Sequence, residues 1–132
     1  MQYNGEGLQE SEFSLSGYNL YSANIGTTKK RGIIIYVDSS FKSCEVNLTS
    51  GFEEFLVVKV CLGIDNNTIH LGAFYRSPSS CNENNDSLLS LLDTISETIK
   101  QAIIIIGDFN YKNIDWLNHV ANTYSSISEK IF

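Results

Sequence analysis

The chain has 132 residues, of which 42% are hydrophobic and 18% are charged, and its formal net charge is -6. These values exclude a disordered chain and provide enough apolar material for one domain with one core. The acidic balance also argues against a protein that holds nucleic acid through a basic surface alone. It does not exclude a nuclease, because a bound divalent cation supplies positive charge where it is needed.

The cysteines and the N-terminal segment indicate where the protein acts. Cys44, Cys61 and Cys81 show none of the spacings typical of a zinc site. An odd number of cysteines without a secretory signal predicts reduced thiols in an intracellular protein. Residues 1–6 lack the apolar run of a signal peptide, and no run is long enough to span a membrane. We therefore expect no membrane partner.

Short β-branched and aromatic runs, separated by polar segments, follow the polar residues 1–17. The strands predicted from them are 18–21, 33–37, 44–48, 55–62 and 69–75. The Asp65-Asn66-Asn67 turn signal lies between the last two, so these are expected to form a β-hairpin.

Residues 87–100 are predicted to form an amphipathic helix, because apolar side chains recur there at the spacing of one helical face. These side chains are Leu88, Leu91, Leu92, Ile95 and Ile99. Asp86 or Ser87 is the expected N-terminal cap. Lys100 lies at the C-terminal end, where a cation is favourable.

Residues 102–106 are rich in isoleucine and predict a fully buried strand that stops at Gly107. The tail, 124–132, has the spacing of a short helix. The order of strands, helix and strand indicates an α/β sandwich in which helices cover a sheet.

Asp108 and Asn110 stand directly after this isoleucine strand. Residues two apart in extended backbone point to the same side, and Gly107 allows the chain to approach a ligand closely. A carboxylate orients water or a metal ion and an amide donates to a phosphate oxygen, which suits phosphoryl transfer. The spacing alone leaves a second interpretation open, in which Gly-Asp-x-Asn is only a turn at a strand end.

Five motifs, in family order, resemble those of the endonuclease/exonuclease/phosphatase superfamily, in the subgroup carried by non-LTR retrotransposons. They are Gly17-Tyr18-Asn19-Leu20-Tyr21, Arg31-Gly32-Ile33-Ile34-Ile35-Tyr36-Val37, Phe74-Tyr75-Arg76-Ser77-Pro78, Ile105-Ile106-Gly107-Asp108-Phe109-Asn110 and Ile114-Asp115-Trp116. The resemblance implies a partial DNase I-like α/β sandwich, in which two packed sheets of mostly antiparallel strands are flanked by helices. Residues 1–132 are then a single, truncated domain.

The resemblance also implies roles for individual residues. Asp108 would orient or activate the attacking water, and Asn110 would hydrogen-bond the scissile phosphate. Tyr75 would place its hydroxyl on the phosphate or on the leaving oxygen. Arg76 would contact a backbone phosphate, since a guanidinium matches phosphate geometry. A solvated surface arginine is the alternative interpretation of Arg76.

The sequence departs from the family at both ends. The glutamate that mainly binds the metal in the family would fall at about Met1, and Glu6 lacks its surrounding motif. The family's Ser-Asp-His motif, with a second aspartate and the general-base histidine, is not found before Phe132. His70, expected to be structural, and His119, expected to be exposed, stand outside such a motif. We therefore assign no metal ligand, although the complete domain is expected to use Mg2+ or Mn2+.

These observations give two hypotheses. The first is a fragment of a metal-dependent DNA endonuclease that nicks target DNA for reverse transcription, inactive as an isolated chain. Its partners would be DNA, bound weakly here, and a reverse transcriptase domain in the parent polyprotein, with nuclear action implied. The second is a non-catalytic remnant or interaction module on the same fold. Another hydrolase of the superfamily, such as a deadenylase or a lipid or inositol phosphatase, is a variant of the first.

Overall fold

The computed structural model describes residues 10–23, 32–63, 67–111, 114–115 and 120–121. In chain order the elements are the 3-10 turn η1 (Glu10–Phe13), β1 (Tyr18–Ala23), β2 (Ile33–Asp38), β3 (Ser43–Glu45), β4 (Phe55–Cys61), β5 (Thr68–Tyr75), α1 (Asn82–Thr98), β6 (Ala102–Asp108), β7 (Ile114–Asp115) and β8 (Val120–Ala121). In this part of the chain, no helix is long and apolar enough to cross a membrane.

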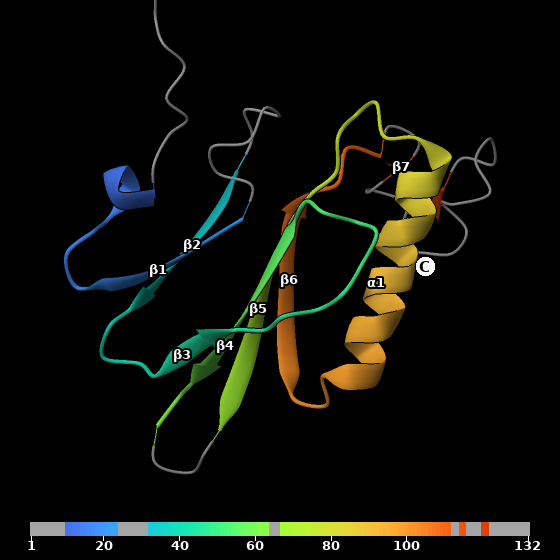
Figure 1. Ribbon diagram of the computed structural model, residues 1–132. Helices are drawn as coiled ribbons and strands as arrows, with labels where there is room; N and C mark the ends of the chain where they lie inside the picture. Colours follow the sequence, from blue (N-terminus) through green and yellow to red (C-terminus); the bar gives the residue numbers. More distant parts are fainter. Residues whose placement is uncertain (1–9, 24–31, 64–66, 112–113, 116–119, 122–132) are drawn as a thin grey trace, which may run out of the picture.

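The larger sheet has the strand order β3-β4-β5-β6, and β1 pairs with β2 in a separate antiparallel sheet. The pairings β3–β4 and β4–β5 are antiparallel, whereas β6 runs parallel to β5. Parallel neighbours need a crossover, and α1 provides it between β5 and β6. Figure 1 shows α1 on one side of the larger sheet and β1–β2 on the other. The predicted α/β sandwich with two sheets and mostly antiparallel strands is confirmed.

Two cores fill the spaces between these layers. The core between α1 and the larger sheet consists of Phe52, Val57, Phe74, Leu88, Leu91, Ile95 and Ile99. The core between the two sheets consists of Val37, Leu56, Val58 and Val60, with side chains of β1, β2 and β5 packed against it. Because β4 is covered on both faces, its sequence is a continuous apolar run rather than a strict alternation.

The helix begins earlier than its apolar periodicity predicts. Its N-cap residue is Cys81, not Asp86 or Ser87, and the preceding Pro78 segment ends β5 well before it. Glu83 lies in the first turn, where a carboxylate is favourable beside the helix N-terminus. At the other end, the Lys100 Nζ donates to the carbonyl of Ser96 at 3.2 Å, as its position predicts.

The isoleucine strand is the clearest correction. β6 was expected to be fully buried, but Ile104 and Ile106 are 47% and 66% exposed and Ile105 is 38% exposed. The physical reason is that β6 pairs on one side with β5 and is the last strand of the sheet among the described residues. The sheet of β1 and β2 packs over β4 and β5 instead. The strand also runs through Gly107 to Asp108, rather than stopping at the glycine.

Several other boundaries differ slightly from the prediction. The hairpin of β4 and β5 is confirmed, with Cys61 paired to Thr68 nearest its turn. The strand predicted at 44–48 is shorter and begins one residue earlier, as β3. The helix predicted at 124–132 lies outside the described residues.

Candidate active site

The carboxyl ends of β5 and β6 lie side by side, because the two strands are parallel neighbours. In their register Tyr75 is paired with Asp108. Side chains alternate along each strand, so both residues lie on the face that carries Leu71 toward the inter-sheet core. Tyr75 is half-buried, and its backbone N–H donates to the Glu54 carbonyl at 2.9 Å. Asp108 is exposed, so its carboxylate is accessible to water or to a substrate.

Asn110 joins this site in a way that the sequence did not predict. Its φ is 50°, in the left-handed region, so the backbone is not extended through Asn110 as expected from the two-residue spacing. Asparagine adopts this conformation more readily than most residues. Its side-chain nitrogen donates to the Arg76 carbonyl at 2.9 Å. An amide nitrogen carries two hydrogens, so this bond is compatible with a second one to a phosphate oxygen.

Arg76 is a buried residue, with 7% of its surface exposed, so the interpretation as a solvated surface arginine is wrong. Its Nε donates to Asn85 Oδ1 at 2.7 Å. Its Nη1 donates to the carbonyls of Phe109 and Asn110, at 3.1 and 3.0 Å. The prediction that Arg76 contacts a backbone phosphate stays a prediction.

Tyr111 packs beneath the same guanidinium, whose Cζ lies 4.1 Å from the centroid of its ring. Burial raises the pKa of the Tyr111 hydroxyl, and the positive charge of Arg76 opposes this rise. The hydroxyl makes no hydrogen bond of good geometry in the described part of the chain, although it lies close enough to the Arg76 side chain for a polar interaction that also lowers its pKa. The cation therefore interacts with the face of the ring.

A stack of three phenylalanine rings anchors the loop after β6. The rings of Phe55 and Phe74 are 6.0 Å apart, and those of Phe74 and Phe109 are 6.2 Å apart, both nearly parallel. Offset stacking of this kind contributes about 0.5–1.5 kcal/mol per pair beyond burial. The loop that carries the candidate residues is thus attached directly to the core under α1.

Gly107 allows β6 to approach the neighbouring strand β5 closely. A Cβ on Gly107 would lie 2.4 Å from the Phe74 carbonyl oxygen, well inside van der Waals contact. The sequence suggested that this glycine lets the chain approach a ligand, whereas the structure shows a close approach between two protein backbones. The absent side chain allows β6 to run along β5 up to Asp108.

Comparisons with known proteins support the resemblance that the motifs predict. Residues 69–131 match the sequence model of the family described as endonuclease-reverse transcriptase. Among solved structures, the fold is similar to the endonuclease domain of TRAS1, a telomere-specific non-LTR retrotransposon, with a TM-score of 0.54 and 18% identity. The resemblance to the non-LTR retrotransposon endonucleases is confirmed. The similarity covers 74% of this chain and 43% of that structure. A search of curated protein sequences found no match.

The part of the chain that matches the endonuclease-reverse transcriptase family contains the site residues, from β5 to the loop after β6. Sequence reasoning singled out Tyr75, Arg76, Asp108 and Asn110, and the structure brings all four together. It missed Asn85 and Tyr111 as their neighbours. A usable signal was present for Asn85, which stands one turn before Leu88 on the apolar face of the helix.

The described residues around Asp108 do not build a divalent-metal site by themselves. Mg2+ prefers several oxygen ligands, and Asp108 offers one exposed carboxylate. No group of three or more His, Cys, Asp or Glu side chains that could hold a metal is found in the described ranges. His70 is buried in β5, and its Nδ1 has no hydrogen-bond partner in the described part of the chain. Glu6 and His119 lie outside the described residues.

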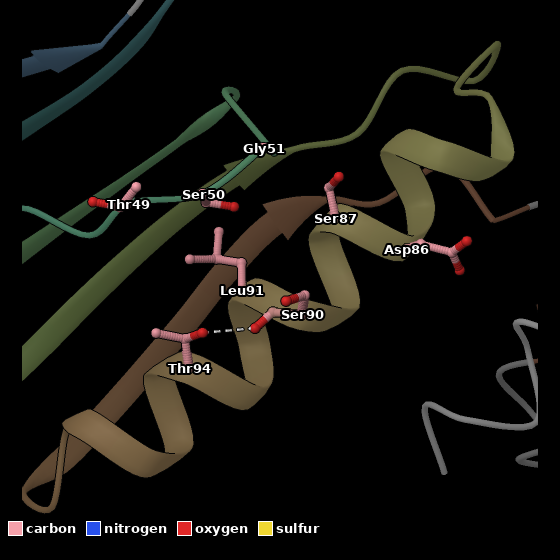
Figure 2. A pocket seen from close by; sticks show the side chains of 8 residues that line it. All are labelled: Thr49, Ser50, Gly51, Asp86, Ser87, Ser90, Leu91 and Thr94. Carbon is pink, nitrogen blue, oxygen red and sulfur yellow. Dashed lines mark hydrogen bonds between the residues drawn. The ribbon is translucent and has the colours of Figure 1, made fainter.

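A surface groove of about 410 Å3 lies elsewhere, between residues 49–51 and α1 (Figure 2). Its lining is rich in hydroxyl groups, but the Ser87 and Thr94 hydroxyls donate to helix carbonyls, at 2.9 Å each. The site residues at the ends of β5 and β6 do not line it. We assign no chemistry to this groove.

Proposed function

We propose that this chain is part of a metal-dependent phosphodiesterase, a DNA endonuclease that nicks target DNA for reverse transcription. One observation carries the proposal: the parallel pairing of β5 and β6 sets Tyr75 beside Asp108, with Asn110 on the adjoining loop. These residues lie within the region that matches the endonuclease-reverse transcriptase family.

Each residue has a distinct part in the proposed reaction. The Asp108 carboxylate accepts a hydrogen bond from the attacking water and orients it. The Asn110 amide donates to an oxygen of the scissile phosphate, and the Tyr75 hydroxyl donates to the phosphate or to the leaving oxygen. Oriented donors and acceptors of this kind supply most of the rate enhancement when charge develops on phosphate oxygens.

The proposed cofactor is Mg2+ or Mn2+, which neutralises charge on the phosphate when it is bound. This part of the proposal rests on the resemblance, because the described residues do not form its site. DNA is the proposed substrate, and a reverse transcriptase domain in the parent polyprotein is the proposed partner. Action in the nucleus is also proposed, and it rests on the family resemblance alone.

A second candidate is a non-catalytic remnant or interaction module on the same fold. The exposed isoleucines of β6 favour it, since an apolar strand that ends the sheet among the described residues is suited to binding another protein surface. The two candidates differ in whether Asp108 matters for cleavage of DNA.

A plasmid-nicking assay with Mg2+ tests the proposal. It compares this chain with a version extended at both ends by the flanking gene sequence, each with and without Asp108→Ala. Asp93→Ala, on the exposed side of α1, is the matched control. We expect nicking by the extended version, its loss with EDTA, and a fall of about 10²–10⁴-fold in Asp108→Ala alone.

Each alternative result has a definite meaning. Asp108-dependent nicking by the 132-residue chain would show that other residues of this chain complete the metal site. Nicking that survives Asp108→Ala would refute the role of Asp108. If neither version nicks, the interaction module becomes the better proposal.

A further inference from the structure

Arg76 joins three elements of the fold at one point. It follows directly after β5, and its side chain bonds to Asn85 in α1 and to the loop after β6. We use the term Arg76 clasp for the group of residues that these contacts join, which are Arg76, Asn85, Asp108, Phe109, Asn110 and Tyr111.

The bonds of the clasp run in both directions between Arg76 and the loop. The backbone N–H of Arg76 donates to the Asp108 carbonyl at 2.8 Å, and its Nη1 donates to the next two carbonyls. In return, the Asn110 side chain donates to the Arg76 carbonyl. Charged hydrogen bonds are roughly twice as strong as neutral ones, so this arrangement holds the loop firmly.

Asn85 orients the guanidinium. It is 4% exposed, and its Oδ1 accepts from Nε at 2.7 Å, which fixes the plane of the group from the side of α1. The ring of Tyr111 then lies against one face of that plane. A buried guanidinium needs such partners, because an unpaired buried charge is strongly destabilising.

We propose that Arg76 is a positioning residue, which holds the Asp108–Asn110 loop in its reactive conformation and does not bind a DNA phosphate. The left-handed conformation of Asn110 follows from this arrangement, since Nη1 and the Arg76 carbonyl hold both sides of that residue. The inference rests on the proposed function for the roles of Asp108 and Asn110. The hydrogen bonds of the clasp are observed independently of that function.

Two variants separate positioning from phosphate binding. Asn85→Leu removes the acceptor of Nε but cannot alter a DNA contact, because Asn85 is buried. Arg76→Lys keeps the positive charge, with which an ammonium still binds phosphate as a point charge, but loses the planar fork that donates to Asn85 and to the loop carbonyls of the clasp. Asn84→Ala is the matched control, since Asn84 bonds to Ser80 outside the clasp.

The first measurement uses NMR on the 132-residue chain and needs no enzymatic activity. We expect a protected Arg76 Nε–H signal in the wild type and its loss in Asn85→Leu. The backbone order parameters of Phe109 and Asn110 should fall from about 0.85 to below about 0.6 in both variants and stay unchanged in Asn84→Ala. Unchanged order in both variants would overturn the inference, whether or not the protein nicks DNA.

The second measurement compares kcat and KM in whichever version of the protein nicks DNA. Displacing a catalytic group by about 1 Å lowers the reaction rate roughly 100-fold. Both Asn85→Leu and Arg76→Lys should therefore lose about that factor in kcat, with little change in KM. A phosphate contact predicts the opposite pattern. Asn85→Leu and Arg76→Lys would then keep kcat, and Arg76→Gln would raise KM and reduce the salt dependence by about one phosphate contact. That pattern would refute the positioning role.

Discussion

Gly107→Ala tests the contact that brings the site together. The added methyl carbon would lie close to three atoms of Phe74: the carbonyl oxygen at 2.4 Å, the Cβ at 3.0 Å and the carbonyl carbon at 3.1 Å. Two of these three atoms belong to the backbone of a paired strand, so they move only if β5 and β6 separate. The change therefore acts on the strand end immediately before Asp108.

The expected magnitude follows from two opposing effects. Overpacking of this kind costs about 1–3 kcal/mol. Replacing glycine also restricts the unfolded chain, which returns about 0.4–1 kcal/mol. We expect the free energy of unfolding to fall by about 1–2 kcal/mol, which lowers Tm by roughly 4–7 °C for a domain of this size.

Urea unfolding followed by circular dichroism measures this loss. Gly51→Ala is the matched control, because its Cβ would meet the Ser87 side chain, with the movable Oγ nearest at 3.0 Å. We expect the control to change the midpoint little. A Gly107→Ala variant that unfolds at the same urea concentration as the wild type, or at a higher one, would refute the close approach of the two strands.

Further predictions concern burial and ionisation. Tyr111→Phe should raise the free energy of unfolding by up to about 1 kcal/mol, because it removes a buried hydroxyl that makes no hydrogen bond of good geometry in the described part of the chain. Folding raises the pKa of Tyr111, so above about pH 10 the tyrosine ionises first in the unfolded chain. The free energy of unfolding of the wild type should therefore fall as the pH rises above about 10. Urea midpoints measured across this pH range should fall less in Tyr111→Phe than in the wild type. Ile106→Thr should change the free energy of unfolding by less than about 0.5 kcal/mol, whereas Leu91→Ala should lower it by about 2–5 kcal/mol. Equal losses in these two variants, measured by urea unfolding, would contradict the exposure of β6.

The sequence predicted those parts of the fold that depend on local pattern. Short β-branched and apolar runs located β4 and β5, helical periodicity located the body of α1, and an isoleucine-rich run followed by Gly107 located β6. The family resemblance, rather than any local pattern, implied that Tyr75 and Asp108 act in one site, and the parallel pairing of β5 and β6 places the two residues side by side.

The remaining features depend on contacts between distant segments. The exposure of Ile104 and Ile106 depends on which strands the smaller sheet covers, and no local pattern contains that information. The bonds of Arg76 to Asn85 and to Asn110 depend on where α1 begins relative to the loop. The sequence did not predict the first residue of α1, because the polar residues at its start have the composition of a loop.

The parallel pairing of β5 and β6 also determines when the site forms during folding. The β4–β5 hairpin closes between Cys61 and Thr68, but the contact of Arg76 with Phe109 spans 33 positions. Closing the longer loop costs about 1.4 kcal/mol more in free energy, through lost chain entropy, if the segment between Arg76 and Phe109 is flexible. Forming α1 first shortens that loop, so the helix is expected to precede the β5–β6 pairing. The residues proposed for cleavage are therefore expected to assemble late, and substitutions in α1 should delay their assembly without touching them.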